Sequence, residues 1–548
     1  MTETMTDLPI GIASFKRIRS KNYIYADKTE LLYKLLKRRN PLLFSRPRRF
    51  GKTLLISTLE AILRGRRELF KGLWLDKSDY DWAPKPVIRL SLASIDTESV
   101  STVKSDLIFK VKAIAKSEGL FIRGETPGRL FSSLLKRLYD KYHCDVAVLI
   151  DEYDAPILNK IEKPELAEEI RDTLKKFYLV LKDEERIRGF TLITGITLVG
   201  GVVKNANSFN SPGLNNLYDL TLKPEYSTIC GFTIEEFDSL FSKHMEAMLV
   251  QFKADGIMPK EATLTDIRQL ILNYYDGYSW DGQTSVLNPW SILNAFKVKM
   301  LGNYWWQTGG VPSFLKQLVH SGDISFSHSN SEVSITNSCN VLELGDQLEP
   351  TPVLFQSGYL TVERVKKNIS SAYYFLKIPN IEVRVFLIHI VLSLEQIINP
   401  LRAMKQAEAM LNSLINLESK GFEDSFMAFI GCFYPNDSAK NKEEKGYFQR
   451  LLQAAVLLVC ANIEIELEAA DEQHGGKNEQ YDGNFDPYND RKFILKYREA
   501  GQDAYRLATL VIEGQMPFSQ QRQVYVEFKK EQQIKKAKRR ANKRQIGP

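Results

Sequence analysis

Two periodicities of apolar residues alternate along the first 230 residues of the chain. Short apolar runs predict buried strands, and segments with an apolar residue at every third or fourth position predict helices. The predicted strands cover residues 41–45, 87–92, 145–150 and 189–196, and the clearest predicted helices cover 30–39, 54–63 and 164–183. The first of these helices follows Thr29, whose hydroxyl is a suitable N-cap. Strands that alternate with helices are typical of an α/β layer with a largely parallel sheet.

The pattern changes twice after residue 230. Residues 231–296 have a helical pattern that starts with a capping-box sequence at Thr233 and Glu236. Residues 300–400 are mixed and aromatic, and the polar stretch 321–340 predicts a loop. Further helices are predicted at 403–417, 447–462 and 498–513, and a strand at 524–528. We therefore predict three domains, which cover residues 1–230, 231–400 and 401–548.

The composition narrows the class of protein. A content of 44% hydrophobic residues excludes a disordered chain, and 31 Gly and 21 Pro are too few for a collagen-like one. No apolar run reaches the ~18–20 residues of a membrane span, and the first 30 residues lack a signal-peptide layout. The five cysteines form no C-x-x-C pair, which argues against zinc and for reduced thiols. The expectation is a soluble, cytoplasmic protein without a membrane partner.

The positive net charge of +7 comes entirely from the end of the chain. Residues 529–544 hold nine Lys or Arg and one acid, a local balance of +8, so the other 532 residues sum to about −1. Such a run is either a solvated, frayed end or a contact for a polyanion. DNA or RNA is therefore one partner that the basic tail predicts.

The segment between Arg46 and Thr53 follows a predicted strand and opens a predicted helix. In that context Gly51, Lys52 and Thr53 predict a phosphate-binding loop, with backbone N–H groups facing the phosphates and the lysine reaching their oxygens. The Thr53 hydroxyl is placed to ligate Mg²⁺. The generic motif has Gly where this chain has Arg46, and a strand-helix turn with a surface lysine is the alternative interpretation. Arg48 and Arg49 flank the phosphates and could bind them, bind a nucleic-acid backbone, or simply be solvated.

A second motif supports the phosphate loop. The predicted strand 145–150 ends in Asp151 and Glu152, about 100 residues after the loop. Asp151 would hold Mg²⁺ through water, and Glu152 would polarise the attacking water. Thr194 ends the next strand, where its hydroxyl would either sense the γ-phosphate or cap the strand. Together these residues predict ATP and Mg²⁺ as cofactors.

With these motifs the chain resembles the AAA-ATPase-like proteins that carry a C-terminal PD-(D/E)XK nuclease-like domain. The resemblance is specific from residue 8 to about 385 and weak beyond 400. Its landmarks include the stretches 8–11, 25–29, 45–53, 149–156, 213–217, 231–233, 275–278, 287–291, 355–360 and 379–383. Arg in place of the first Gly of the loop is also a feature of that family. The aromatic landmarks Tyr275, Tyr278, Trp280 and Trp290 would serve core and lid packing or, alternatively, base stacking.

The resemblance implies a nuclease site in the C-terminal region. Such a site needs acidic residues that hold Mg²⁺ and a Glu-x-Lys strand whose lysine orients water. The candidates are Asp482, Glu527 and Lys529, with Glu444 as a supporting acid. Asp482 and Glu527 are 45 residues apart, so the segment 490–521 would have to loop out for their strands to pair. That spacing departs from the pattern of the family. Either the domain carries an insertion between the two acids, or it has lost its catalytic geometry and is inactive.

The sequence thus predicts an α/β P-loop NTPase domain with a parallel sheet, a helical and winged lid region, and a C-terminal α/β nuclease-like domain. ATP binding and hydrolysis would switch the lid and the C-terminal region, with nucleic-acid binding or cleavage as the output. A signalling or scaffold ATPase whose C-terminal region binds a protein partner is the main alternative. A nucleotide-binding module without turnover is the other, and Glu152 argues against it. Assembly into a homo-oligomer is left open.

Overall fold

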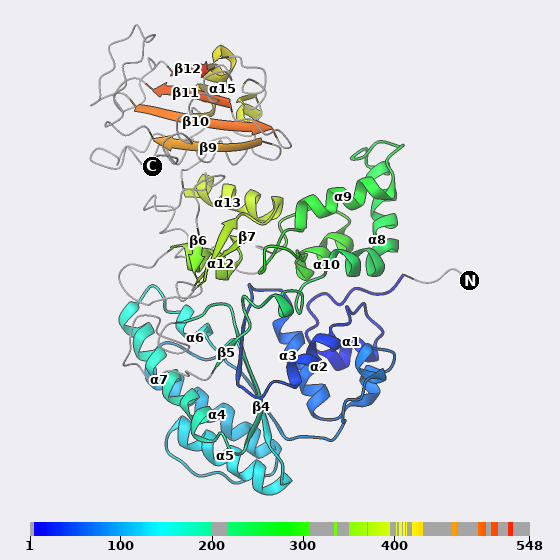
Figure 1. Ribbon diagram of the computed structural model, residues 1–548, viewed down its shortest axis with the longest axis vertical. Helices are drawn as coiled ribbons and strands as arrows, with labels where there is room; N and C mark the ends of the chain where they lie inside the picture. Colours follow the sequence, from blue (N-terminus) through cyan, green and yellow to red (C-terminus); the bar gives the residue numbers. More distant parts are fainter. Residues whose placement is uncertain are drawn as a thin grey trace. The chain divides into compact units, whose positions relative to one another are not determined.

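The computed structural model describes most of the first 305 residues and parts of the rest (Figure 1). The described residues are 5–199, 217–305, 334–336, 350–369, 371–394, 419–430, 463–469, 491–499, 506–512 and 524–529, with single positions between 402 and 413. They divide into two compact units. The first comprises residues 1–310 and 333–383, and the second comprises 311–332 and 384–548. The domain boundaries predicted at residues 230 and 400 stay predictions.

A five-stranded parallel sheet organises the first unit, as the alternating pattern predicts. Its order is β2-β3-β4-β1-β5, and every neighbouring pair is parallel. The strands are β1 (Leu42–Ser45), β2 (Val87–Ser91), β3 (Val146–Asp151), β4 (Arg188–Gly195) and β5 (Tyr218–Asp219). All six residues of β3 are buried, which is typical of a central parallel strand covered on both faces. Because the strands are parallel, Ser45, Asp151 and Gly195 end them at one edge of the sheet.

Helices cover both faces of this sheet (Figure 1). They are α1 (Phe15–Ser20), α2 (Thr29–Leu36), α3 (Lys52–Leu63), α4 (Val100–Ser117), α5 (Pro127–Tyr142), α6 (Ala155–Leu158) and α7 (Pro164–Asp183), with the 3-10 turns η1 (Arg67–Phe70), η2 (Trp74–Lys77) and η3 (Pro224–Tyr226). The main core lies between the sheet and α4, α5 and α7, where Leu107, Phe131, Leu134 and Leu174 are completely buried with Val148.

The start of α2 corrects one detail of the prediction. Thr29 is the first residue of the helix and not its N-cap, and the helix ends at Leu36, three residues before the predicted end. The N-cap is Lys28, whose side chain makes no capping hydrogen bond, and the Oδ1 of the preceding Asp27 accepts hydrogen bonds from the Thr29 backbone N–H at 2.9 Å and from the Thr29 hydroxyl at 2.6 Å. The Asp27 carboxylate thereby satisfies the first backbone N–H group of the helix.

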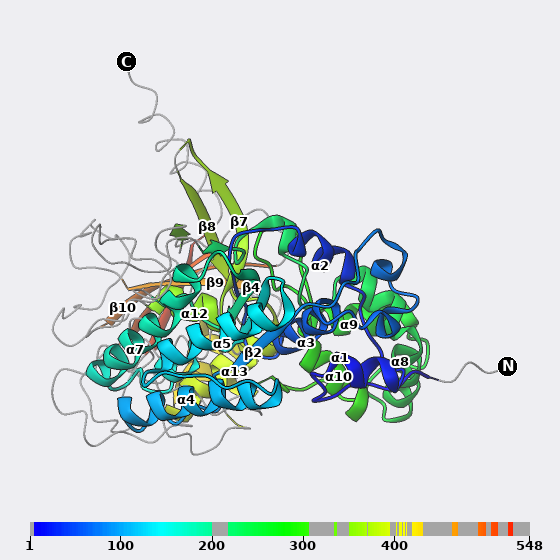
Figure 2. The same cartoon turned by 90° about the horizontal axis from the view of Figure 1, so that it is seen from below.

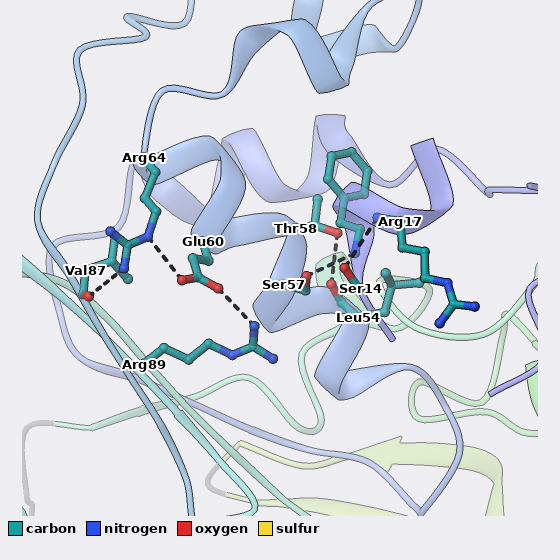
Figure 3. Close-up of polar contacts among 10 residues, drawn as sticks. Ser14, Arg17, Leu54, Ser57, Thr58, Glu60, Arg64, Val87 and Arg89 are labelled. Atoms are coloured by element: carbon teal, nitrogen blue, oxygen red, sulfur yellow. Dashed lines mark hydrogen bonds and ion pairs between the residues drawn. The ribbon is translucent and has the colours of Figure 1, made fainter. Parts of the chain in front are cut away.

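Polar contacts on two sides hold α3, the helix that follows the phosphate loop (Figure 3). On one side, the Ser57 hydroxyl accepts a hydrogen bond from the Phe15 backbone N–H at 3.0 Å. On the other, the Glu60 carboxylate pairs with Arg64 at 3.1 Å and with Arg89 of β2 at 2.9 Å. These contacts fix the helix between α1 and the edge of the sheet.

Three helices form the next part of the first unit: α8 (Ile234–Ala254), α9 (Leu264–Tyr275) and α10 (Pro289–Val298). The predicted capping box is confirmed, because the Thr233 hydroxyl accepts from the Glu236 N–H at 3.2 Å and the Glu236 carboxylate accepts from the Thr233 N–H at 2.9 Å. The buried side chains of these helices form a core of their own, to which Ile24 of the N-terminal segment contributes.

A small antiparallel sheet completes the first unit. It consists of β6 (Ser334–Thr336), β7 (Thr361–Lys367) and β8 (Ala372–Lys377) in the order β6-β8-β7, and α12 (Pro350–Ser357) precedes the β7–β8 hairpin. The winged lid that the sequence predicts in this region stays a prediction.

The second unit contains α15 (Ser419–Ile430) and a four-stranded antiparallel sheet, while α13 (Ile381–Leu394) crosses the boundary between the units. The sheet has the order β12-β11-β10-β9, with β9 (Ile463–Ala469), β10 (Arg491–Glu499), β11 (Arg506–Ile512) and β12 (Val524–Lys529). The predicted strand at 524–528 is confirmed as β12. The predicted helix at 498–513 is wrong, because β10 and β11 occupy most of it. The predicted helix at 447–462 lies outside the described residues.

Within the part of the chain that the structure describes, no helix is both long and apolar enough to cross a membrane.

Glu382 carries a buried carboxyl group in the first unit. Its side chain is fully buried, the Ser291 hydroxyl oxygen lies 2.9 and 2.8 Å from its two carboxyl oxygens, within hydrogen-bond distance of both, and the Trp305 backbone N–H donates to Oε1 at 3.1 Å. Burial raises the pKa of Glu382 from 4.5 to about 7, although these hydrogen bonds lower it. The protonated acid is therefore favoured in the fold below about pH 7.

We expect Glu382→Gln to flatten one part of the pH dependence of stability. Since the folded pKa is raised, the wild type binds a proton on folding between pH 4.5 and about 7, and its stability falls as the pH rises through that window. Glutamine has no proton to lose. The free energy of unfolding of Glu382→Gln, relative to that of wild type, should therefore rise by on the order of 2 kcal/mol from pH 5 to pH 8. Urea unfolding across this pH range measures it. Glu68→Gln, at an exposed position, is the control, and parallel curves for Glu382→Gln and wild type would contradict the assignment.

Candidate nucleotide-binding site

The edge formed by the ends of β1, β3 and β4 brings together the residues that the two sequence motifs contribute. Ser45 is in register with Gly195, and Ser91 with Asp151. Thr194 and Asp151 meet directly, because the Thr194 hydroxyl donates to the Asp151 Oδ1 at 2.7 Å. Both side chains are buried, at 0% and 2% exposure. Thr194 therefore contacts the carboxylate instead of merely capping its strand.

The phosphate loop joins β1 to α3. Gly51 is the N-cap of α3 with φ at 96°, a left-handed conformation that glycine adopts without strain. Lys52 and Thr53 are the first two residues of the helix, where backbone N–H groups have no partner within the helix. This is the geometry that binds anions at a helix N-terminus.

The Lys52 amine lies inside the loop. Its Nζ donates to the backbone oxygen of Arg46 at 2.8 Å and to that of Pro47 at 2.9 Å, and the residue is 6% exposed. An ammonium group has three donors, so one remains for a phosphate oxygen. Burial lowers the pKa of Lys52, while the carboxylates of Asp151 and Asp154 raise it. A bound anion would favour the charged amine further.

Arg46 occupies the position of the first glycine of the generic motif. Its guanidinium donates to the backbone oxygens of Thr221 at 2.9 Å and Tyr226 at 3.2 Å. It also lies 3.9 Å from the centroid of the Trp280 ring. Burial lowers the pKa of Arg46 to about 9. The loop tolerates a long side chain here because that side chain fills a cage of carbonyls and aromatic rings instead of the anion site.

The two other loop arginines are exposed and differ in their surroundings. The Arg49 guanidinium lies 4.4 Å from the centroid of the Trp290 ring. The positive charge of Arg48 lowers the pKa of Glu152, so Arg48 influences the carboxylate that follows β3. Phosphate binding by either residue stays a prediction.

Glu152 follows β3 in a strained backbone conformation. Its φ of 54° is left-handed, which is uncommon for a residue with a side chain outside turns and helix ends, and such strain recurs at functional sites. Burial and the neighbouring Asp151 raise the pKa of Glu152, and Lys52 and Arg48 oppose them. A carboxylate with a raised pKa at the edge of a phosphate site is suited to act as a general base.

Mg²⁺ would depend on the nucleotide for several of its ligands. Among the described residues, no three His, Cys, Asp or Glu side chains are grouped as a metal site. Thr53 is half-buried at the first turn of α3, and Asp151 ends β3. One hydroxyl and one carboxylate, completed by phosphate oxygens and water, are the ligands that Mg²⁺ commonly takes in nucleotide sites.

Asp154, to which the sequence motifs assigned no separate role, fixes the loop after β4. Its Oδ2 accepts from the backbone N–H groups of Ile196 at 2.9 Å and Thr197 at 2.6 Å, and from the Thr197 hydroxyl at 2.8 Å. Gly195 has no room for a side chain, since a Cβ there would lie 2.6 Å from the Tyr153 ring. Thr194 is thereby held beside Asp151. The sequence feature that could have pointed to this role is the position of Asp154 itself, an acidic residue three positions after Asp151.

A second group to which the sequence motifs assigned no role comes from the end of α12, within the landmark stretch 355–360. The Gln356 carboxamide oxygen accepts from the Leu198 N–H at 2.9 Å, and a Cβ at Gly358 would lie 2.8 Å from the Pro47 side chain. Residues 356–358 therefore contact both the phosphate loop and the loop after β4.

The aromatic landmarks pack against the phosphate loop. The Phe50 ring lies 4.8 Å from that of Tyr278 and 5.5 Å from that of Trp280, centroid to centroid, and Tyr275 is fully buried. Of the two interpretations, lid and core packing fits Tyr275, Tyr278 and Trp280, because buried rings are not available for base stacking.

The C-terminal candidates are only partly described. Glu527 and Lys529 lie on β12, in register with Thr509 and Leu507 of β11, while Asp482 and Glu444 lie outside the described residues. The segment 490–521 does not loop out as the nuclease hypothesis required, because it contributes β10 and β11 to the same sheet. Two strands, β10 and β11, thus lie within the 45 residues that separate Asp482 from Glu527. A site shared by these two acids stays a prediction.

Comparison with known proteins supports the first part of this picture. Residues 9–202 match the model of a family described as "Predicted AAA-ATPase". Over 465 residues, or 84% of each chain, the sequence is 29% identical to "Uncharacterized protein in vnfD 5'region" of Azotobacter chroococcum mcd 1. No solved structure matches. None of these findings supports a PD-(D/E)XK nuclease in the C-terminal region.

Proposed function

We propose that the chain binds Mg²⁺-ATP at the edge of the parallel sheet and hydrolyses it. The observation that carries the proposal is the Lys52 amine, held by two loop carbonyls at the N-terminus of α3. A buried cation with a spare donor, beside N–H groups that lack helical partners, is a site for a polyphosphate. The match of residues 9–202 to a predicted AAA-ATPase family supports the same function.

Each residue has a role in this proposal. Gly51, Lys52 and Thr53 bind the β- and γ-phosphates, and Thr53 and Asp151 hold Mg²⁺. Glu152 accepts a proton from the attacking water. Thr194 fixes the Asp151 carboxylate and lies where the γ-phosphate would be sensed, with Asp154 and Gln356 holding its loop in place.

The segment 356–358 is suited to transmit the nucleotide state. It contacts the two loops that would face the γ-phosphate, and it leads into the β7–β8 hairpin. The output beyond it has two candidates: nucleic-acid binding or cleavage by the C-terminal region with its basic tail 529–544, and binding of a protein partner. A Mg²⁺-dependent cleavage assay with and without ATP separates them.

We expect the purified full chain to bind a fluorescent ATP analogue and to release phosphate from ATP only when Mg²⁺ is present. The metal neutralises charge that develops on the phosphates, so EDTA should stop phosphate release and added Mg²⁺ should restore it. Isothermal titration and a phosphate-release assay measure the two steps. A chain that binds no nucleotide with or without Mg²⁺ would refute the proposal.

A further inference from the structure

The β7–β8 hairpin projects from the rest of the first unit (Figure 2). Residues 361–377 contain one acid, Glu363, and four basic residues, one Arg and three Lys, so the local charge is +3. The 532 residues outside the basic tail sum to about −1, which makes the hairpin a basic element on a nearly neutral body.

The strand register places three of the four cations on one face, while Lys367 pairs with Ala372 and lies on the other. Arg364 pairs with Phe375 and Lys366 pairs with Tyr373, and cross-strand partners share a face of the sheet. Lys377 follows Tyr373 and Phe375 in the same alternation. This face, which we call the basic face, therefore carries Arg364, Lys366, Tyr373, Phe375 and Lys377.

The opposite face of the hairpin is buried and mainly apolar near its base, and it carries the exposed Lys367 near its tip. Val362, Tyr374 and Leu376 are buried. Burial and the negative charge of Asp219 in β5 raise the pKa of the Tyr374 hydroxyl. On the basic face, Lys366 and Lys377 are exposed and Tyr373 is half-buried. The hairpin thus presents its basic face to solvent.

Cations and rings alternate on the basic face. The Arg364 guanidinium lies 3.5 Å from the centroid of the Phe375 ring, which is only 7% exposed, so the arginine covers this ring. Tyr373 is therefore the ring of this face that a further planar group can reach. Lysines on an edge strand such as β7 also discourage pairing with other strands, but that role requires no aromatic residue beside them and no cation on the central strand β8, which carries Lys377.

Hydrogen bonds fix the base of the hairpin. The Ser279 N–H donates to the Thr361 hydroxyl at 2.7 Å, and the Val362 N–H donates to the Ser279 backbone oxygen at 3.1 Å. These bonds join the start of β7 to the segment that carries Tyr278 and Trp280, whose rings pack on Phe50 of the phosphate loop. The basic face therefore stands on a base that is anchored to the body of the unit.

We propose that the basic face of the β7–β8 hairpin binds the backbone of single-stranded nucleic acid. Cations spaced along an extended strand match a chain of phosphates, and an aromatic ring between them offers a platform for a base. An acidic peptide would use the cations but not the ring. A membrane would use apolar residues at the tip of the hairpin, where Ile369 is exposed but has Asn368 beside it. The proposal does not depend on ATP hydrolysis.

The test compares two double variants of the full chain that lose the same charge. Lys366→Ala/Lys377→Ala removes two exposed cations from the basic face, and Lys112→Ala/Lys116→Ala removes two exposed cations from α4. Binding of a fluorescein-labelled oligothymidylate is measured against salt by fluorescence anisotropy. We expect the hairpin variant to lower the slope of log K against log salt by about 1.4, at about 0.7 for each lost phosphate contact on a single strand. The α4 variant should leave the slope unchanged.

Tyr373→Ala tests the stacking part of the proposal. It should weaken binding of the oligonucleotide roughly five- to hundredfold without changing the salt slope, because a stacked base carries no counterion. The basic tail is present in every variant, so differences between variants report on the hairpin. Equal slopes for the two double variants, or no binding by wild type, would overturn the proposal. A second outcome would overturn it too. If the Lys366→Ala/Lys377→Ala variant lost binding to vesicles containing phosphatidylserine but bound the oligonucleotide as wild type does, the basic face would be assigned to a membrane surface.

Discussion

Lys52→Ala is expected to weaken the binding of Mg²⁺-ATP by about a hundredfold or more. The substitution removes a charge-assisted hydrogen bond to phosphate, which is worth about 1.5–3 kcal/mol, and it also removes the positive charge from a buried anion site. The Lys52 amine further holds the loop together through the backbone oxygens of Arg46 and Pro47. Titration with a fluorescent ATP analogue measures the loss.

The control for this variant is Lys71→Ala, which removes an exposed lysine of the same unit. It should bind nucleotide as wild type does. Circular dichroism and the thermal midpoint of Lys52→Ala separate loss of the site from loss of the fold. Equal nucleotide affinity for Lys52→Ala and wild type, with both folded, would contradict the assignment of the loop.

Local sequence was enough to predict the elements that carry the site. The buried runs before Arg46 and ending at Asp151 could each be recognised without knowledge of the rest of the chain, because a central parallel strand is apolar throughout. The parallel order then brings their ends to one edge. For this reason Lys52, Asp151 and Thr194 could be expected close to one another, and the structure agrees.

Contacts between distant residues could not be predicted in the same way. Arg46 looks like a departure from the loop motif, and its carbonyl partners on Thr221 and Tyr226 lie 175 and 180 residues later. Gln356 meets Leu198 across 158 residues. No local periodicity carries such information, since it depends on which loops the sheet order brings together.

The error in the C-terminal region has a different physical cause. In the segment that forms β11, Leu507, Leu510 and Val511 are spaced by three and one, which suits a helix. The same residues form a strand because β10 and β12 pair with its two edges. Short apolar runs satisfy both periods, and tertiary pairing decides between them.

Glu152→Gln is expected to keep ATP binding and to lower the turnover of ATP at least ~10²-fold, the usual size of general-base catalysis. Glutamine has nearly the shape of glutamate and can occupy the same left-handed backbone position, but it cannot accept the proton of the attacking water. Lys52 and the phosphate loop are unchanged, so the affinity for Mg²⁺-ATP should stay within a few-fold of wild type. Single-turnover hydrolysis and nucleotide titration of the same preparation measure both quantities.

The pH profile tests whether Glu152 is the base and not merely a structural acid. Burial and Asp151 raise the pKa of Glu152 above its ordinary 4.5, so the wild-type rate should fall as the pH drops through a value higher than that of a solvated glutamate. This fall in rate at low pH, the acidic limb of the profile, should be missing from the residual activity of Glu152→Gln, because glutamine does not titrate. Glu169→Gln, at an exposed position of α7, should keep both the rate and the limb. If Glu152→Gln retains the acidic limb, another group accepts the proton, and Glu152 acts only by holding the end of β3.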